Sequence, residues 1–502
     1  MGARTPLLAS AALLGALASA APAGGGPRLP ELPLHRFTLA NGLEFVLVDR
    51  PGSANIAAGW VVRAGSAADL PEAPGTAHLI EHLLFKGSRS IGTRDYAAEE
   101  AHRVAAERLR AEIADHESTS APQLSTLRLR LDEAEAAARA LTISGELSLL
   151  YSEAGGGPAT ARTFEDFSLY TVELPAEALE LWFWLESDRL LAPVVRDLRS
   201  EVEIVAEEQR QRAASEPGAE HADRVRAALW GDHPYGRPVL GDPEALRRLD
   251  RAAVAEEIER RYRPAAITAV LAGQFDRAQV EGWARRYFGR LPAGGGAPAV
   301  SAKRPGVTTP TVLELDCGDC GTQVEIAYLT SAIGSADSAA LELVAGLLNG
   351  RGGRLYREWV VERGIARSAY VIQHARALGG SFRLRAEAAA GVSSATLESA
   401  WRDLVGSLST SPPAPGELER VRARIGRESF ERLKEPSQLV AELLTHHGLG
   451  QPLRLTHWAS QIQTLTAADV QRTVRRQLGG EPRVVARYRR PTTAADGPRR
   501  GR

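Results

Sequence analysis

The chain has 502 residues, which is more than a single hydrophobic core normally serves, so two large domains are the natural expectation. Hydrophobic residues make up 44% of the sequence and charged residues 25%, as in ordinary globular proteins. The 61 Lys and Arg residues nearly balance the 62 Asp and Glu residues. The net charge therefore gives no reason to expect binding to nucleic acid or to an acidic membrane surface.

The first twenty residues resemble a targeting segment. Arg4 precedes an apolar stretch from Leu7 to Leu17, and Ala18-Ser19-Ala20 then supplies the small-x-small pattern of a signal peptidase site. The stretch is shorter than the roughly 20 residues of a membrane-spanning helix, and no later stretch is long and apolar enough to form one. We predict a signal peptide at residues 1–20, an exported protein that is periplasmic or alternatively secreted, and no stable membrane span. An uncleaved anchor is the other interpretation.

The mature chain begins with patterns that are typical of a sheet. Apolar residues alternate on both sides of Asn41-Gly42, which indicates a β-hairpin over residues 35–50. Residues 56–63 are typical of a buried strand. Pro74-Gly75 ends this region, and a helix is predicted to follow.

Residues 97–150 differ in composition, because Ala, Arg, Glu and Leu dominate them. Between Leu124 and Leu141, apolar residues follow at alternating steps of three and four, which is the pattern of a coiled-coil seam. A second helical arm precedes the break at residues 118–122. The segment predicts a coiled-coil helical hairpin that protrudes from the first domain. A spacer or packing arm is favoured over a device that binds a partner.

The rest of the chain alternates strands and helices in blocks. In the first half we predict one strand over 159–174, helices over 176–191, 196–213 and 217–229, a strand over 268–272 and a helix over 277–287. A Gly- and Pro-rich linker at 293–306 follows. In the second half we predict strands over 311–329, 368–388 and 483–489 and helices over 336–349, 354–363, 394–407 and 415–433. This order indicates an α+β protein of two similar domains, 30–292 and 307–490, with a disordered tail at 491–502.

The first predicted helix carries the sequence His78-Leu79-Ile80-Glu81-His82. Positions i, i+3 and i+4 share one face of a helix, so His78, Glu81 and His82 lie together. Two neutral imidazoles suit zinc, which takes three protein ligands in a catalytic site and leaves one position for water. A carboxylate beside that water takes its proton, and His-x-x-Glu-His is a known zinc peptidase signature. The alternative is an amphipathic helix whose histidines cover a core.

A third ligand must come from another segment. Residues 201–210 are helical in character, and Glu201 and Glu208 are two turns apart on one face. Acidic residues on an exposed helix are usually only solvated, so the spacing by itself does not select either glutamate.

Taken together, these motifs resemble the M16 peptidase family, which includes pitrilysin, insulinase and the mitochondrial processing peptidase. The resemblance extends over essentially the whole mature chain, and it rests on the inverted His78-x-x-Glu81-His82 motif, on Glu201 and Glu208, and on Ala161-x-Thr163-x-x-Asp166-x-Ser168-x-Tyr170. It implies two homologous domains, each with a mostly antiparallel sheet flanked by helices. It also implies one Zn²⁺ per chain, held by His78, His82 and Glu208, with Glu201 in support and Glu81 as the catalytic base.

The same resemblance implies a substrate-binding edge strand at Thr160, Ala161 and Thr163, which would pair with an extended substrate backbone. Three departures from the family pattern are visible. The spacing from His82 to Glu208, 208 − 82 = 126 residues, is longer than usual because of the helical insertion. Thr160 stands where Asn is usual, and Val360 and Arg367 occupy the second-half positions of an Arg and a Tyr that hold substrate in many members.

These features lead to a functional hypothesis with an open alternative. The chain is predicted to be a zinc endopeptidase that hydrolyses peptides or unfolded polypeptide segments. Because the substrate-holding pair is replaced, a dimer is expected, possibly a heterodimer with a related chain. The alternative is a non-catalytic partner or scaffold that binds polypeptide without cleaving it. Cys317 and Cys320 are interpreted as a structural disulfide or two idle thiols rather than a redox pair.

Overall fold

The computed structural model describes residues 32–115, 121–216, 218–300, 302, 310–318, 320–452 and 461–490. The predicted signal peptide, the predicted tail and part of the predicted linker lie outside the described residues. Within the described residues, no helix combines the length and the apolar character that crossing a membrane requires.

The described strands form two sheets. The first has the order β1-β2-β6-β3-β5-β4, with β1 (Leu34–Thr38), β2 (Glu44–Asp49), β3 (Asn55–Val62), β4 (Thr160–Thr163), β5 (Ser168–Pro175) and β6 (Ile267–Gly273). The second has the order β7-β11-β8-β10-β9, with β7 (Thr311–Asp316), β8 (Gln323–Thr330), β9 (Ala366–Ala375), β10 (Gly380–Ala388) and β11 (Val484–Arg489). Both sheets are mixed, because β2 and β6 pair in parallel, as do β7 and β11, while the other neighbours are antiparallel.

The two sheets share one topology. Strands β2 to β6 of the first sheet correspond in chain order, position and direction to β7 to β11 of the second, and β1 is an addition at one edge. This correspondence agrees with the predicted repetition in the sequence, whereas the exact domain boundaries stay a prediction.

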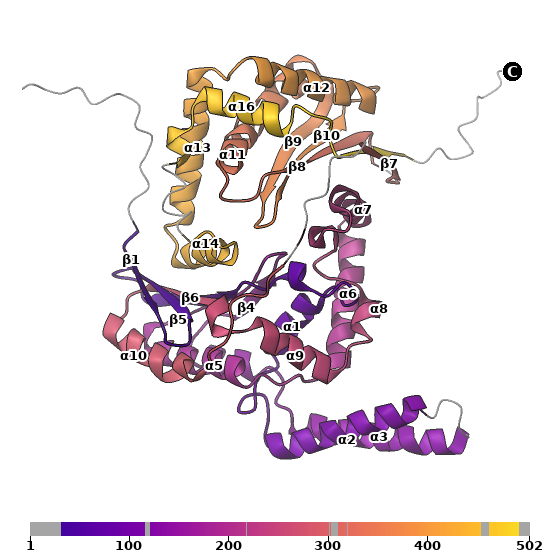
Figure 1. The fold of residues 1–502 in the computed structure, drawn as a ribbon, viewed down its shortest axis with the longest axis vertical. Coiled ribbons are helices and arrows are strands. Elements are labelled where there is room, and N and C mark those ends of the chain that lie inside the picture. Colours follow the sequence, from indigo (N-terminus) through magenta and orange to yellow (C-terminus); the bar gives the residue numbers. More distant parts are fainter. Residues whose placement is uncertain are drawn as a thin grey trace, which may run out of the picture.

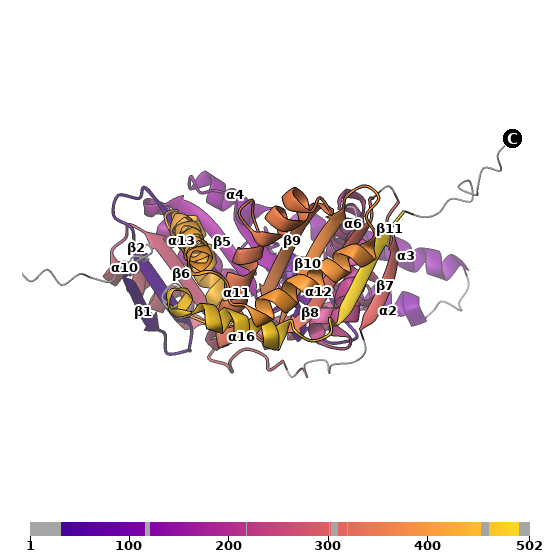
Figure 2. The same cartoon turned by 90° about the horizontal axis from the view of Figure 1, so that it is seen from above.

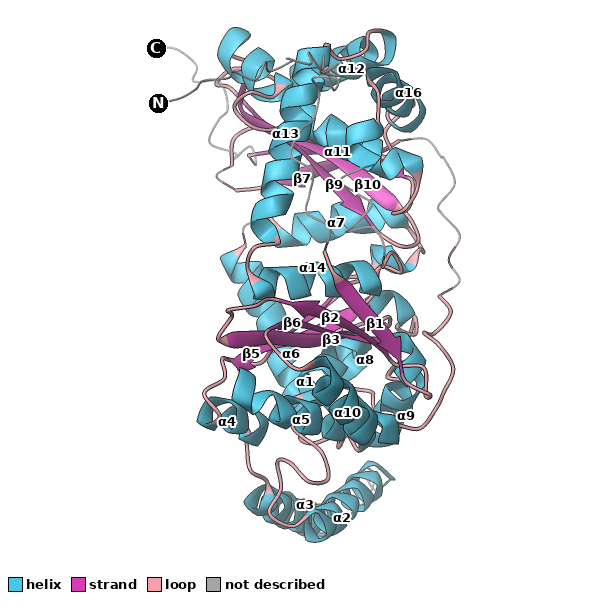
Figure 3. Ribbon diagram, turned by 90° about the vertical axis from the view of Figure 1, so that its left-hand side faces the viewer, coloured by secondary structure: helices cyan, strands magenta, loops and turns pink. Residues whose placement is uncertain are grey.

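Helices cover the sheets in layers (Figures 2 and 3). The first half contains α1 (Thr76–Leu84), α2 (Tyr96–Asp115), α3 (Ala121–Leu141), α4 (Glu146–Glu153), α5 (Leu179–Leu191), α6 (Leu198–Ser215), α7 (Ala219–Trp230), α8 (Pro243–Leu246), α9 (Arg251–Arg261) and α10 (Arg277–Tyr287). The second contains α11 (Ala336–Leu348), the π-helix η6 (Leu355–Glu362), α12 (Ser394–Thr410), α13 (Pro415–Arg432), α14 (Pro436–Gly448) and α16 (Ala467–Gln477).

Two helices are exchanged between the halves. Helix α14 comes from the second half of the sequence but packs on β3, β5 and β6 of the first sheet (Figure 1). Its inward side chains are Leu439, Val440, Leu443 and Leu444. Helix α7 comes from the first half and packs against the second sheet, where Val225, Leu229 and Trp230 contact side chains of β7, β8 and β11. Each sheet therefore depends on a helix from the other half for part of its cover.

We expect Leu443→Ala to lower the free energy of unfolding by about 2–5 kcal/mol, because Leu443 is fully buried between α14 and the first sheet. Urea unfolding of the full chain measures the effect. Leu129→Ala is the matched control, since Leu129 is 59% exposed on α3 and its loss should change stability by no more than about 0.5 kcal/mol. Equal stability of the two variants would contradict the packing of α14.

Helices α2 and α3 lie side by side and project away from the first sheet (Figure 1). Arg110 and Glu135 form an ion pair between them, with a distance of 2.6 Å from Nη2 to Oε1. Leu127 and Ala138 of the predicted seam are buried, but a coiled coil stays a prediction. The predicted insertion at 97–150 ends inside α4, whose Leu147 and Tyr151 belong to the main core.

Several predicted elements were wrong in detail. The strands predicted over 159–174, 311–329 and 368–388 are each two strands, because β4 ends at Thr163 and β5 begins at Ser168, β7 ends at Asp316 and β8 begins at Gln323, and β9 ends at Ala375 and β10 begins at Gly380. Helices α8, α9, α14 and α16 were not predicted. The cysteines form a disulfide between Cys317 and Cys320, with a Cα–Cα distance of 5.5 Å, after β7.

Candidate metal centre

Helix α1 presents the predicted motif on one face. Its apolar residues Leu79, Ile80, Leu83 and Leu84 are buried in the main core, so the opposite face is left for His78, Glu81 and His82. The rings of His78 and His82 lie with their centroids 4.7 Å apart. The two imidazoles are thus neighbours, as the helical spacing predicts.

The beginning of α1 is fixed by an aspartate that the sequence analysis missed. The buried Asp69 carboxylate accepts hydrogen bonds from the backbone N–H groups of Gly75, at 2.8 Å, and Ala77, at 2.9 Å. Arg261 pairs with the same carboxylate at 2.8 Å. Burial raises the pKa of Asp69, and the arginine and the two N–H groups act in the opposite direction. No local pattern marks Asp69, because its partners lie in two separate segments.

Helix α6 supplies the third side chain. Glu208 Oε2 lies 3.0 Å from His78 Nε2 and 3.7 Å from His82 Nε2. One ligand atom from each of the three residues lies within 4.8 Å of the other two. Ligand atoms on a tetrahedral zinc with bonds of about 2.1 Å are separated by about 3.4 Å, so the observed spacing fits one ion. The Glu208 side chain is 46% exposed, which leaves the cluster open to solvent on one side.

Glu201 lies behind the cluster and orients one imidazole. His82 Nδ1 lies 3.3 Å from Glu201 Oε2, and Lys86 Nζ lies 2.6 Å from Glu201 Oε1. Burial acts to raise the pKa of Glu201, but hydrogen bonds from His82 and Lys86 outweigh it and lower the pKa. When the ionised Glu201 accepts a hydrogen bond from the Nδ1–H group of His82, the Nε2 atom of His82 carries the free lone pair. This Nε2 atom is on the side of Glu208.

The chemistry of the donor set also fits a cation. Burial acts to lower the pKa of His78, but the carboxylates of Glu81 and Glu208 outweigh it and raise the pKa. Two carboxylates thus converge on one buried imidazole and favour positive charge there. A divalent cation between His78, His82 and Glu208 would satisfy the same need, and the group could hold a metal.

Glu81 lies beside the three candidate ligands. Its Oε2 atom lies 3.6 Å from His78 Nδ1 and accepts a hydrogen bond of 2.5 Å from Thr163 Oγ1. Thr163 Oγ1 is also 2.9 Å from Ser168 Oγ. Thr163 of β4 therefore holds the carboxylate of Glu81 in place, and Ser168 of β5 contacts Thr163. The sequence analysis assigned no role to Ser168 beyond its place in the motif.

Strand β4 forms the edge of the first sheet. It pairs on one side with β5, in the register Thr160 with Thr171 and Thr163 with Ser168. Thr163 faces Glu81, Ala161 packs on the main core, and Thr160 Oγ1 lies 3.0 Å from Thr171 Oγ1. The outer side of β4 has no strand partner among the described residues, so the predicted edge strand lies at an edge next to the cluster.

The two second-half positions that depart from the family pattern lie outside this cluster. Val360 is on η6 and packs against the core of the second half. Arg367 is on β9, the edge strand of the second sheet, and its Nη1 lies 3.3 Å from Glu387 Oε1.

Comparison with known families decides the classification. The model described as "Insulinase (Peptidase family M16)" matches residues 44–107, which contain the His78–His82 motif. The model described as "Peptidase M16 inactive domain" matches residues 248–425. The chain belongs to the M16 peptidase family. The first match covers the segment that holds the candidate ligands His78 and His82, and the second lies mostly in the other half of this M16 chain.

Relatives of this M16 chain carry zinc protease names. An uncharacterised zinc protease of Mycobacterium tuberculosis is 27% identical over 340 residues, which cover 67% of this chain and 66% of that protein. The β subunit of the mitochondrial-processing peptidase of Neurospora crassa is 26% identical over 267 residues, which cover 53% of this chain and 44% of that protein. The match thus spans slightly less than two thirds of the mycobacterial relative and less than half of the fungal one.

Solved structures share the fold of this chain. A protease from Helicobacter pylori superposes with a TM-score of 0.74 at 17% identity, covering 92% of this chain and all (100%) of that one. The periplasmic protease PqqL from Escherichia coli superposes with a TM-score of 0.66 at 14% identity, covering 94% of this chain and 49% of that one. At these identities the likeness establishes an α+β architecture of two mixed sheets flanked by helices.

Proposed function

We propose that this M16 chain is a zinc-dependent endopeptidase that hydrolyses peptides or unfolded polypeptide segments. The observation that carries the proposal is the convergence of His78, His82 and Glu208, with Glu81 beside them and an edge strand adjacent. The zinc protease names of the relatives support it.

Each side chain has a role in the proposed reaction. His78, His82 and Glu208 would hold one Zn²⁺, which would supply Lewis acidity. Glu81 takes a proton from the attacking water and delivers it to the leaving amine. Thr163 orients the Glu81 carboxylate through its 2.5 Å hydrogen bond. Glu201 holds the His82 ring.

Substrate would bind by adding a strand to β4. An extended backbone beside Thr160, Ala161 and Thr163 would use the outer N–H and C=O groups of β4, and it would run past Glu81. Because backbone hydrogen bonds require an extended chain, this mode of binding suits peptides and unfolded segments rather than folded domains.

The proposed assembly is a dimer, possibly a heterodimer with a related M16 chain. Val360 has no hydrogen-bond donor in its side chain, and Arg367 pairs with Glu387, so neither supplies the substrate-holding pair that the family resemblance implies. The relative from Neurospora crassa is named as a subunit, which agrees with this arrangement.

We also propose that the protein is exported, to the periplasm or beyond. The apolar N-terminal stretch and its small-x-small site support this location. One structural neighbour, PqqL from Escherichia coli, is named as a periplasmic protease.

Metal content and metal-dependent cleavage test the proposed function. The purified chain should contain about one zinc per chain, and it should cleave an unfolded reporter polypeptide. Chelation should abolish cleavage, and added zinc should restore it. A chain that binds unfolded polypeptide without zinc and without cleavage would instead support the non-catalytic scaffold.

A further inference from the structure

The turn between β4 and β5 is held by the first half of the chain on one side. This turn, residues 164–167, directly follows Thr163. The backbone N–H of Ser66 donates to the carbonyl of Phe164 at 3.0 Å, and that of Ala67 donates to the carbonyl of Glu165 at 2.8 Å. A Cβ atom on Gly65 would lie 2.2 Å from the Phe164 carbonyl oxygen, so the turn lies directly against the Gly65 backbone.

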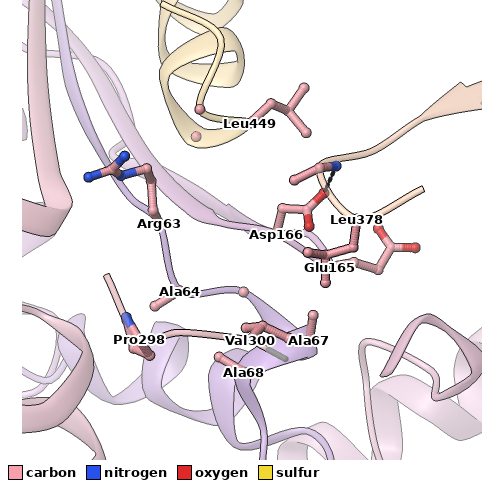
Figure 4. Close-up of a pocket in the computed structure, with 14 residues that line it drawn as sticks. Arg63, Ala64, Ala67, Ala68, Glu165, Asp166, Pro298, Val300, Leu378 and Leu449 are labelled. Carbon is pink, nitrogen blue, oxygen red and sulfur yellow. Dashed lines mark hydrogen bonds between the residues drawn. The ribbon is translucent and has the colours of Figure 1, made fainter. Parts of the chain in front are cut away.

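The other side of the turn contacts the second half. The β9–β10 turn, residues 376–379, donates the backbone N–H of Ala377 to Asp166 Oδ2 at 3.1 Å (Figure 4). Arg376 Nη2 pairs with Glu165 Oε1 at 2.6 Å. By the topology of the sheets, these are corresponding turns of the two halves, and they meet each other.

Tyr235 completes the contact between the turns. Its hydroxyl donates a hydrogen bond to Asp166 Oδ1 and accepts one of 2.9 Å from the backbone N–H of Leu378. The Tyr235 ring is fully buried, and the Arg376 guanidinium lies 5.3 Å from its centroid. One phenol oxygen thus connects an acidic residue of the β4–β5 turn to the backbone of the second half.

The packing around this contact is incomplete. A cavity of about 190 Å³ lies beside it, lined among others by Ala64, Glu165, Asp166, Pro298 and Leu378 (Figure 4). Because apolar packing is interrupted there, the polar contacts of Asp166 and Tyr235 carry much of the positioning of this turn.

We propose that Asp166 and Tyr235 are positioning residues of the M16 site, which use the second half of the chain to fix β4 against Glu81. The path is short, because Asp166 is three residues from Thr163, and Thr163 donates to the Glu81 carboxylate. The inference rests on the proposed peptidase function for its kinetic consequence. Its structural consequence, the order of β4, is independent of any activity.

Hydrogen–deuterium exchange of the full chain tests the structural consequence. Tyr235→Phe keeps the ring and removes only the hydroxyl. Amides of residues 160–168 should then exchange about tenfold faster, since a hydrogen bond to a charged group is lost. Tyr287→Phe is the matched control, because it removes a hydroxyl that donates at 2.7 Å to Glu180 on α5, a contact that involves no residue of this turn. Unchanged exchange at 160–168 in Tyr235→Phe overturns the proposal. A uniform rise over the whole first half also overturns it, because that result indicates general destabilisation.

A double substitution tests whether the two residues act through each other. Asp166→Ala and Tyr235→Phe should each accelerate exchange at 160–168, and the double variant should be no faster than the faster single variant. If the double variant accelerated exchange by the product of the two single effects, Asp166 and Tyr235 would act independently. That result would overturn the proposal that they act through each other.

Kinetics test the functional consequence. With an unfolded substrate, Tyr235→Phe should raise KM about tenfold, because a less firmly held β4 would bind the substrate more weakly. The zinc content should equal that of the wild type. If the wild type itself lacks peptidase activity, the proposed function fails, while the exchange measurements still decide the role of Asp166 and Tyr235. If the wild type is active and KM is unchanged, the positioning role is wrong.

Discussion

Glu81→Gln should lower kcat/KM by about 10²–10⁴-fold, the range that a positioned general base contributes, and leave the zinc content unchanged. The introduced glutamine would still accept the hydrogen bond from Thr163 and remain beside His78, because the amide has the shape of the carboxylate. It could not take a proton from water at neutral pH. Cleavage of an unfolded reporter and zinc analysis of the same sample measure both quantities.

The control for this prediction is Glu207→Gln. Glu207 is an exposed residue on α6 that pairs with Arg210, next to Glu208 in the sequence. This variant loses one carboxylate of the same helix and should retain full activity. Retention of activity in Glu81→Gln, with zinc bound, would remove Glu81 from the proposed mechanism.

Glu208→Ala should weaken zinc binding by more than about 100-fold and abolish cleavage at ordinary zinc concentrations. Loss of a residue that only orients a ligand typically costs about 10–100-fold in affinity, and Glu208 is itself a candidate ligand. Competition with a zinc-binding dye measures the affinity. The side chain is 46% exposed, so its removal should change the folding stability little.

Glu207→Ala is again the matched control, because it removes the neighbouring exposed glutamate of α6. It should bind zinc as the wild type does. Equal zinc affinity in Glu208→Ala and Glu207→Ala would show that a different residue completes the site.

The part of the site on α1 could be predicted from local spacing. His78, Glu81 and His82 lie within five residues of one helix, so helical geometry alone brings them together. Glu208 could not be found in that way, because its partners are more than a hundred residues away and acidic helices are common. The family resemblance selected it, and the structure places it 3.0 Å from His78.

Other features depend on tertiary contacts that leave no local signal. The β4–β5 turn contains neither Gly nor Pro, so residues 159–174 resembled one strand. Asp69 fixes α1 through Arg261, which lies far away in the sequence. Helix α14 follows α13 closely, but its packing on the first sheet depends on the arrangement of the two halves.

The exchange of α7 and α14 limits how this protein could be divided. A fragment ending at residue 292, before the linker, would lack α14, and the apolar side chains of Val46, Val48 and Val270 would face water. A fragment that begins after the linker would lack α7 and expose Leu315, Val484 and Ala486. Two fragments expressed from a gene divided at the linker would therefore each expose an apolar sheet face. They should become soluble only when they associate with each other. Each half of the sequence needs a helix from the other half to cover its sheet, so the linker does not separate two independently folding units.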